Sequence, residues 1–168
     1  MRDHQSGSQW PSLALLFHVK LKVSCTASII SPKWLATSHS CISSISVNPL
    51  EWVAFGGPDG FTAVMDETTQ IKIVKDIIHH PHARHHQHLV NYDFALIELH
   101  EPFKFNSLVG AICLEQETSR ESDLCVQAGW TSTSIGQYAM PQETNILASY
   151  SRHQFCSVPE PHATVFSL

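Results

Sequence analysis

The sequence predicts an all-β fold, built as a barrel or a sandwich of short strands. Short apolar runs, some of them alternating with polar residues, follow one another along the chain, as half-buried strands require. Gly, Pro, Ser and Asp lie between these runs and mark turns. No long segment repeats its apolar residues with the 3.6-residue period of a helix, which favours an all-β architecture.

The first predicted strands follow one another closely. Residues 10–17 form an apolar opening run, W-P-S-L-A-L-L-F, and residues 19–25 alternate between apolar and polar side chains. Residues 27–30 are a short run that contains β-branched residues and ends at the turn around Pro32. Residues 34–37 form the next predicted strand.

Further strands follow after a gap. Residues 51–55 are apolar and stop at the Gly-Gly-Pro-Asp-Gly turn of residues 56–60, and residues 71–78 alternate well enough for a strand. The last candidate strands are residues 94–99, 110–114 and 124–130.

The composition is that of one globular domain. The chain has 168 residues, of which 43% are hydrophobic and 15% charged, so it can bury a core. The formal net charge of −5 provides no basic surface for a nucleic acid. No run approaches the ~18 apolar residues of a membrane helix, and residues 13–17 are too short for a signal peptide and lack a basic lead-in. We therefore expect no nucleic-acid partner and no membrane contact.

Two segments are the most informative about function. Residues 25–41 read C-T-A-S-I-I-S-P-K-W-L-A-T-S-H-S-C, and residues 91–99 read N-Y-D-F-A-L-I-E-L. They resemble two signature segments of the chymotrypsin-like serine peptidases, C-G-G-S-L-I leading to T-A-A-H-C, and N-D-I-A-L-L-x-L. The resemblance extends over residues 10–156, in the order that the family has.

The resemblance implies a trypsin-like double antiparallel β-barrel with the active site between the barrels. Residues 10–156 match the complete first barrel and only part of the second. Residues 1–9 form a loose N-terminal segment, and residues 157–168 are a divergent tail that no longer resembles the family. A partial barrel leaves an exposed strand edge, so we expect instability or a partner that covers the edge.

The chain has five cysteines, Cys25, Cys41, Cys113, Cys125 and Cys156. The resemblance implies a disulfide between Cys25 and Cys41, which bracket the loop of the catalytic His. For the other three it implies partners in segments that this sequence does not contain. From the residues alone, free buried thiols in a reducing compartment remain the alternative.

The resemblance also places the catalytic residues. Asp93 falls at the position of the triad Asp, which orients the general base in the family. Ser40 falls at the position of the catalytic His, and a serine cannot accept a proton near neutral pH as an imidazole can. His39 is one residue earlier and is a weak alternative base, because neighbouring side chains of an extended segment point to opposite faces.

The other parts of the family's machinery are missing from the sequence. The nucleophile is absent, because no G-D-S-G-G-P segment occurs among the 168 residues. With that segment go the Gly of the oxyanion hole and the substrate pocket. Residues 1–9 also lack the I-V-G-G-like N-terminus through which the family is activated.

Histidines crowd the loop that precedes Asp93, where His80-Pro81 matches the His-Pro pair of the family's I-x-x-H-P-x-Y segment. Histidine-rich tracts can bind zinc, copper or nickel, so a weak zinc site is a hypothesis beside that of an ordinary surface loop. The candidate ligands are His79, His80, His82, His85, His86 and His88.

Three functional hypotheses follow. The leading one is a serine-peptidase homologue without proteolytic activity, which acts by binding a protein or peptide partner. The second is a serine endopeptidase represented by an incomplete chain, and the third is a metal-binding or pH-sensing module built on the histidine loop. No other cofactor is expected. The resemblance implies an extracellular protein, although no signal peptide is recognisable in the sequence.

Overall fold

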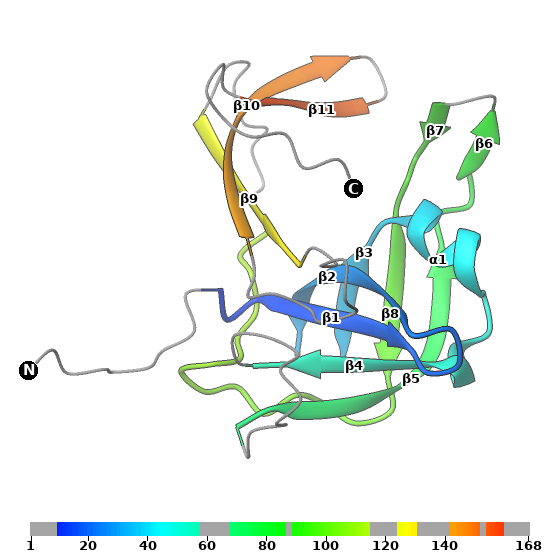
Figure 1. Cartoon of the computed structure of the whole chain (residues 1–168), viewed down its shortest axis with the longest axis vertical. Helices are drawn as coiled ribbons and strands as arrows, with labels where there is room; N and C mark the ends of the chain where they lie inside the picture. The colour runs from blue at the N-terminus through cyan, green and yellow to red at the C-terminus, as the bar shows by residue number, and fades with distance from the viewer. Residues whose placement is uncertain are drawn as a thin grey trace, which may run out of the picture.

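The fold is dominated by a closed antiparallel β-barrel in the N-terminal two thirds of the chain (Figure 1). The computed structural model describes residues 10–57, 68–86, 89–114, 124–130, 142–151 and 154–159. The strands of the barrel occur in the order β1-β2-β3-β8-β5-β4. Their bounds are β1 Leu13–His18, β2 Val23–Ser31, β3 Trp34–Thr37, β4 Trp52–Gly56, β5 Gln70–His79 and β8 Ala95–Leu99.

A three-stranded antiparallel sheet and a short hairpin accompany the barrel. The sheet has the order β11-β10-β9, and the hairpin pairs β6 with β7. Their bounds are β6 Arg84–His86, β7 Leu89–Asn91, β9 Leu124–Gly129, β10 Gln142–Ser151 and β11 Gln154–Pro159. The prediction of an all-β fold with one complete barrel and part of a second is therefore confirmed.

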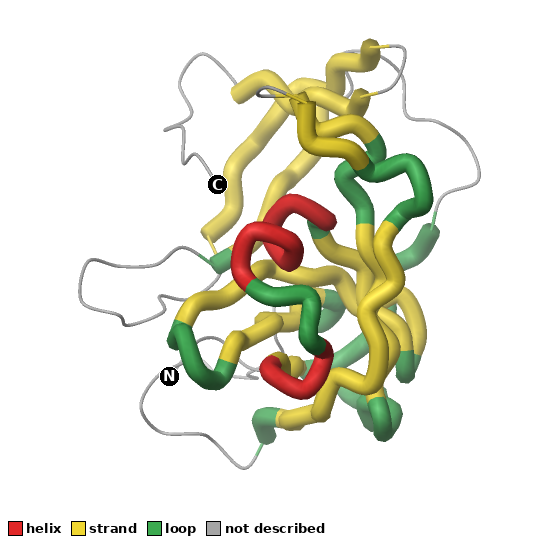
Figure 2. The backbone as a smooth tube through the Cα atoms, turned by 90° about the vertical axis from the view of Figure 1, so that its right-hand side faces the viewer, coloured by secondary structure: helices red, strands yellow, loops and turns green. Residues whose placement is uncertain are grey.

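Two short helical segments interrupt the strands, and Figure 2 shows both of them on the same side of the barrel. They are α1, His39–Ile45, and the 3₁₀ turn η1, Pro49–Glu51. Among the described residues, no helix is long and apolar enough to cross a bilayer.

The sequence misplaced some elements. Residues 23–25 and 27–30 of the predicted strands belong to one strand, β2, which begins at Val23. Residues 19–22 form the preceding turn, where Lys22 is in the left-handed region (φ 59°) and its N–H donates to the carbonyl of His18. The strand predicted at 110–114 is wrong. Residues in that segment donate isolated hydrogen bonds, from Gly110 to Pro11 and from Ile112 to Ile29, and build no ladder.

The two terminal segments predicted from the sequence, 1–9 and 157–168, lie wholly or largely outside the described residues. The loose segment 1–9 and residues 160–168 lie outside the described residues. The boundary set after residue 156 stays a prediction, and strand β11 runs across it to Pro159.

The barrel core is formed by the inward-facing side chains of the six strands, by Ile42 of α1, and by Phe103 and Val109 from the segment after β8. Strand β1 buries all of its residues, because its two faces serve two hydrophobic clusters. Ala14 and Leu16 face the barrel core, while Leu13 and Leu15 pack against Trp130 outside it.

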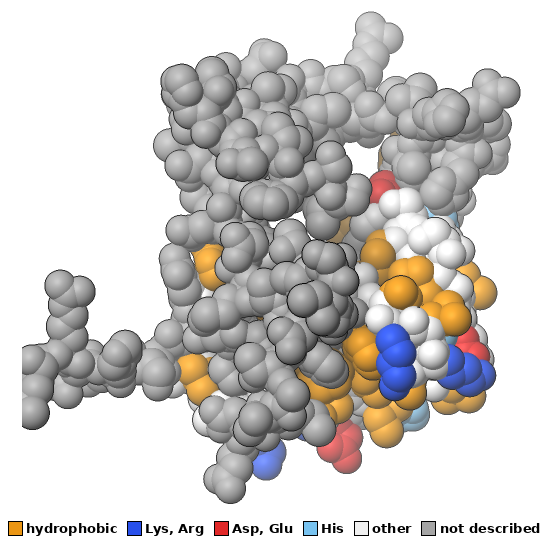
Figure 3. Space-filling view, viewed as in Figure 1, with side chains coloured by type: hydrophobic (Ala, Val, Ile, Leu, Met, Phe, Trp, Pro, Cys, Tyr) orange, Lys and Arg blue, Asp and Glu red, His pale blue; other side chains and the backbone are white. Residues whose placement is uncertain are grey.

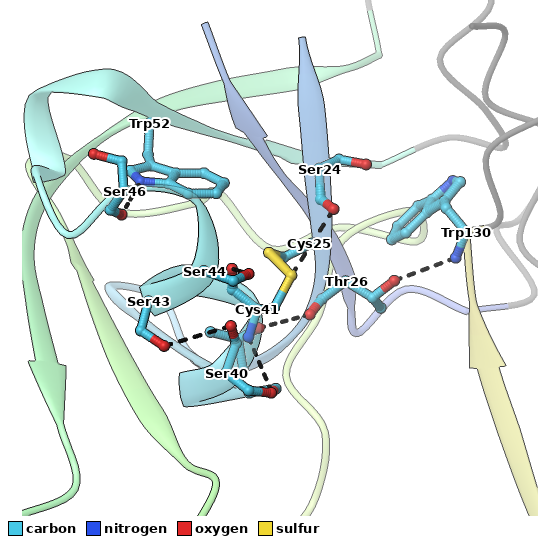
Figure 4. Close-up of a disulfide and its surroundings, with 12 residues drawn as sticks. Ser24, Cys25, Thr26, Ser40, Cys41, Ser43, Ser44, Ser46, Trp52 and Trp130 are labelled. Carbon is cyan, nitrogen blue, oxygen red and sulfur yellow. Dashed lines mark hydrogen bonds between the residues drawn. A yellow bond between two sulfur atoms is a disulfide. The ribbon is translucent and has the colours of Figure 1, made fainter. Parts of the chain in front are cut away.

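Trp130 follows β9 and connects the second sheet to the barrel. Its backbone N–H donates to the hydroxyl of Thr26 on β2 at 3.3 Å, as Figure 4 shows. The preceding Gly129 leaves room for this contact, since a Cβ atom there would lie 3.1 Å from the same hydroxyl oxygen. The Gly129-Trp130 pair therefore has a packing role.

The surface of the described residues mixes side-chain types. Figure 3 shows apolar, basic and acidic side chains side by side on the coloured part of one face. Near the β1–β2 turn, Glu51 accepts hydrogen bonds from Lys20 at 2.7 Å and from Ser46 at 2.7 Å, and it also pairs with His18 at 3.1 Å. Because the N–H of Leu21 donates to Nδ1 of His18, the proton of that ring lies on Nε2 and points to Glu51.

Replacing Leu35 on β3 with Ala should destabilise the barrel by about 2–5 kcal/mol, because Leu35 is fully buried and the substitution leaves a cavity. The matched control is Leu50→Ala, at a leucine that is 77% exposed, for which we expect less than about 0.5 kcal/mol. Denaturant unfolding measures both changes. Equal losses for the two variants would contradict the barrel core.

Acid should weaken the connection between the β1–β2 turn and η1. The hydrogen bonds of Lys20, Ser46 and His18 lower the pKa of Glu51 from 4.5 to about 2. Because the pKa is lowered in the folded state, the carboxylate stabilises the fold above pH 4.5, and this contribution is lost as the pH falls towards 2.

The melting temperatures of the wild type and of Glu51→Gln should therefore differ above pH 4.5 and converge towards pH 2. Glu101→Gln is the control, because its carboxylate is 81% exposed and lies 3.8 Å from Lys72. A difference between wild type and Glu51→Gln that does not change with pH would argue against the role of Glu51.

Candidate functional site

The site lies where the chain passes from the end of strand β3 into helix α1. Ser38 caps the helix, and its hydroxyl accepts the N–H of Cys41 at 3.4 Å. Ile42 anchors the other face of α1 in the barrel core. Sequence reasoning missed this helix and treated His39 and Ser40 as extended, although the Ser residue before it is a typical N-cap.

A disulfide fixes the same helix to strand β2. Cys41 on α1 is bonded to Cys25 on β2, with their Cα atoms 6.1 Å apart (Figure 4). The pairing that the family resemblance implied is therefore confirmed. The bond holds the first turn of α1, and with it Ser40, against the barrel.

Asp93 reaches this helix from a tight turn between β7 and β8. Tyr92 adopts the left-handed conformation (φ 55°), which few non-glycine residues adopt, and its carbonyl accepts the N–H of Phe94 at 2.7 Å. The ring of His80 stacks on that of Tyr92, with centroids 4.7 Å apart and planes 3° from parallel. This turn aims the carboxylate of Asp93 at α1.

The carboxylate of Asp93 is held by two serines. Its Oδ1 accepts the backbone N–H of Ser40 at 2.6 Å, and its Oδ2 lies 2.8 Å from the hydroxyls of both Ser40 and Ser38. The two hydroxyls are also 2.8 Å from each other. Ser38 and Ser40 each have one hydroxyl proton, so these three short oxygen–oxygen contacts share two protons.

These contacts keep Asp93 ionised. Partial burial raises the pKa of Asp93, but the N–H of Ser40, the hydroxyls of Ser40 and Ser38 and the nearby His39 lower it more. The net effect places the pKa of this carboxyl below its ordinary value of 3.8. Asp93 is therefore a carboxylate at neutral pH.

His39 makes a different contact. Its Nδ1 lies 2.7 Å from the Nδ1 of His79, the last residue of β5, and the two rings meet edge to face with centroids 4.6 Å apart. Burial lowers the pKa of His79 below its ordinary value of 6.5, and His39 lowers it further. Within the described ranges, the hydrogen bonds of Asp93 come from Ser38 and Ser40 and not from His39.

Of the other loop histidines, the two whose side chains are described lie apart from the His39–His79 contact. His80 and His82 both pack on the ring of Tyr92. The side chains of His85 and His86 on β6, and all of His88, lie outside the described residues. In the part of the chain that the structure describes, no three His, Cys, Asp or Glu side chains gather to hold a metal ion.

Of the three cysteines outside the disulfide, the structure describes the side chain of one. Cys113 is a free, exposed thiol. The side chains of Cys125 on β9 and Cys156 on β11 are not described, so their pairing stays open.

The arrangement brings together some of the residues that the sequence singled out. Ser40 and Asp93 are in contact, whereas His39 is directed to His79. Sequence reasoning missed Ser38 and the specific partner of His39. The Ser-His-Ser run at 38–40 is the only sequence signal that could have indicated a hydroxyl cluster next to Asp93.

Comparison with known proteins gives the same family for nearly the whole chain. A family model described as Trypsin matches residues 2–161. The chain is also similar to Transmembrane protease serine 9 of Rattus norvegicus, with 31% identity over 130 residues. These residues make up 76% of this chain but only 12% of the rat protein, so the chain spans a small part of that relative's length.

The order of the barrel strands, the Cys25–Cys41 disulfide and Asp93 before β8 agree with this match. The chain belongs to the trypsin family of serine peptidases.

Proposed function

We propose that this chain is a serine-peptidase homologue that does not cleave peptide bonds by itself and acts by binding a protein partner. One observation supports the proposal most strongly. The position of the general base holds Ser40, whose hydroxyl and N–H both face Asp93. A serine hydroxyl does not accept a proton at neutral pH, so Ser40 gives Asp93 no base to orient.

His39 does not replace the missing base. In a catalytic triad, Nδ1 of the imidazole donates to the carboxylate and Nε2 faces the nucleophile. The Nδ1 of His39 is instead engaged with His79 at 2.7 Å. Rotating it towards Asp93 would require breaking this contact and displacing a serine hydroxyl.

A binding role is supported by the aromatic side chains beside the carboxylate. Tyr92 and Phe94 flank Asp93 in the sequence and are 43% and 45% exposed. Aromatic residues are enriched at protein interfaces and often dominate their energy. Both rings are exposed enough to contact a polypeptide.

The disulfide supports an extracellular location. Disulfides form and persist in oxidising compartments, such as the outside of the cell. The Cys25–Cys41 bond fits such a location.

A second candidate is peptide-bond hydrolysis by a longer polypeptide of which this chain is one part. The name of the rat relative describes a protease, and the chain covers only 12% of that protein. In that case, a base other than Ser40 would have to be supplied.

The purified chain should not react with a fluorophosphonate probe, which modifies activated serines, and it should still unfold cooperatively on heating. An active trypsin under the same conditions is the positive control. Labelling of a serine in this chain would overturn the proposal. Absence of a cooperative transition would overturn a binding role for the chain alone.

Replacing Ser40 with His should place an imidazole beside Asp93. A neighbouring carboxylate favours the charged ring, so we expect the pKa of this imidazole to be about one unit above the ordinary ~6.5. An NMR titration compared with the wild type measures it. In the double variant Ser40→His/Asp93→Asn the rise should disappear, and a rise that persists would contradict the assignment of Ser40 to the base position.

A further inference from the structure

Asp93 presents a negative charge at the surface of the molecule. The residue is exposed, and its hydrogen-bond donors are two hydroxyls and a backbone N–H, all of them neutral groups. Among the described side chains, no Lys or Arg forms an ion pair with it, and the lysines that do form ion pairs contact Glu51, Glu98 and Glu101. The charge of Asp93 is therefore hydrogen-bonded without being neutralised by a basic side chain of this part of the chain.

The carboxylate of Asp93 also keeps room for another donor. A carboxylate accepts about four hydrogen bonds, two at each oxygen. Oδ1 accepts the N–H of Ser40, and Oδ2 contacts the hydroxyls of Ser38 and Ser40. Because each hydroxyl has only one proton, these groups supply at most three hydrogen bonds. An acceptor position at Oδ1 therefore remains for a further donor.

Aromatic side chains flank Asp93 in the chain and are held in place. Tyr92 and Phe94 are 43% and 45% exposed. The ring of Tyr92 stacks on that of His80, with centroids 4.7 Å apart, and the N–H of His80 donates to the carbonyl of Phe94 at 3.0 Å. A surface that is fixed before binding loses less conformational freedom when a partner docks on it.

The combination of an anion and aromatic rings selects a basic partner. A carboxylate forms strong, charge-assisted hydrogen bonds with a guanidinium or an ammonium group. Aromatic faces attract cations as well, and arginine makes such contacts more often than lysine, because its planar group stacks on the ring and is more weakly hydrated. The formal net charge of −5 on the whole chain also favours the approach of a basic partner.

The size of protein interfaces places both rings inside one contact with Asp93. A standard interface covers about 800 Å² on each partner, which corresponds to a disc with a radius of about 16 Å. Consecutive Cα atoms are about 3.8 Å apart. Tyr92 and Phe94 therefore fall well within an interface that is centred on Asp93.

We propose that the protein partner presents an arginine side chain to Asp93, which donates to Oδ1 and packs against the neighbouring aromatic rings. The inference rests on the proposed binding function and adds the chemistry of the partner. In an active member of the family, an imidazole of the same chain donates to this carboxylate. Here the additional donor comes from the partner.

Selection of peptides tests this chemistry without a known partner. A phage library of random linear peptides is selected on the wild type and on Asp93→Asn, which keeps the shape of the side chain but not its charge. Peptides selected on the wild type should be richer in arginine than those selected on Asp93→Asn. Binding peptides without this difference would overturn the inference alone. Failure to select any binding peptide would overturn the proposed binding function together with it.

A double-mutant cycle on one selected peptide shows whether its arginine contacts Asp93. Replacing the arginine with citrulline keeps a planar group but removes the charge, and it should weaken binding to the wild type by about fivefold or more. The same replacement should not affect binding to Asp93→Asn. Fluorescence polarisation measures the four affinities, and an equal loss for both proteins would overturn the proposal. If Asp93→Asn does not fold, a wild type that binds both peptides equally would overturn it.

Three further variants complete the test. Glu101→Gln is the matched control, because its carboxylate is 81% exposed and lies 3.8 Å from Lys72, and it should bind both peptides as the wild type does. Phe94→Leu and Tyr92→Leu keep an apolar side chain but remove an aromatic face, and at least one of them should weaken the arginine peptide by about two- to fivefold. Full affinity in both would overturn the packing of the arginine on the rings.

Discussion

The pairing register of β3 with β8 is the constraint on which the site depends. Thr37 lies opposite Ala95 in this antiparallel pair, so the residues that follow β3 meet the residues that precede β8. The chain enters α1 at the very point where Asp93 arrives from the other direction. Because β8 also pairs with β5, the same register brings the end of β5, and hence His79, to the start of α1. A register shift of one residue would move every side chain of β8 to the other face and separate these groups.

Within that frame, Asp93 belongs to a cluster of hydrogen bonds at the position that the family resemblance assigns to the triad. A carboxylate is stabilised by hydrogen-bond donors, and in an active member of the family an imidazole is one of them. Here the donors are two serine hydroxyls and a backbone N–H. They satisfy Asp93 as a carboxylate and lower its pKa. The charge of Asp93 is therefore paired with hydrogen-bond donors in a chain that carries Ser40 on α1.

Much of the barrel could be predicted from the sequence, because alternating apolar residues and turn residues are local signals. Trp34–Thr37 was placed correctly, and the motif around Asp93 located the start of β8. The seven-residue helix α1 is too short to show a helical period, so its capping serine was the only available signal. The contact between His39 and His79 spans 40 residues, and no local pattern encodes it. The segment at 110–114 shows the reverse error, an apolar run that makes isolated backbone hydrogen bonds to the barrel without joining its ladder.

Strand β1 has a consequence for how the molecule unfolds. Its inner face belongs to the barrel core, and Leu13 and Leu15 on its outer face pack against Trp130, the residue that follows β9. Loss of the second sheet would expose Leu13 and Leu15 to water, and loss of the barrel would remove the surface on which Trp130 rests. The two parts therefore depend on each other for stability, and they should melt together in a single transition rather than as independent modules.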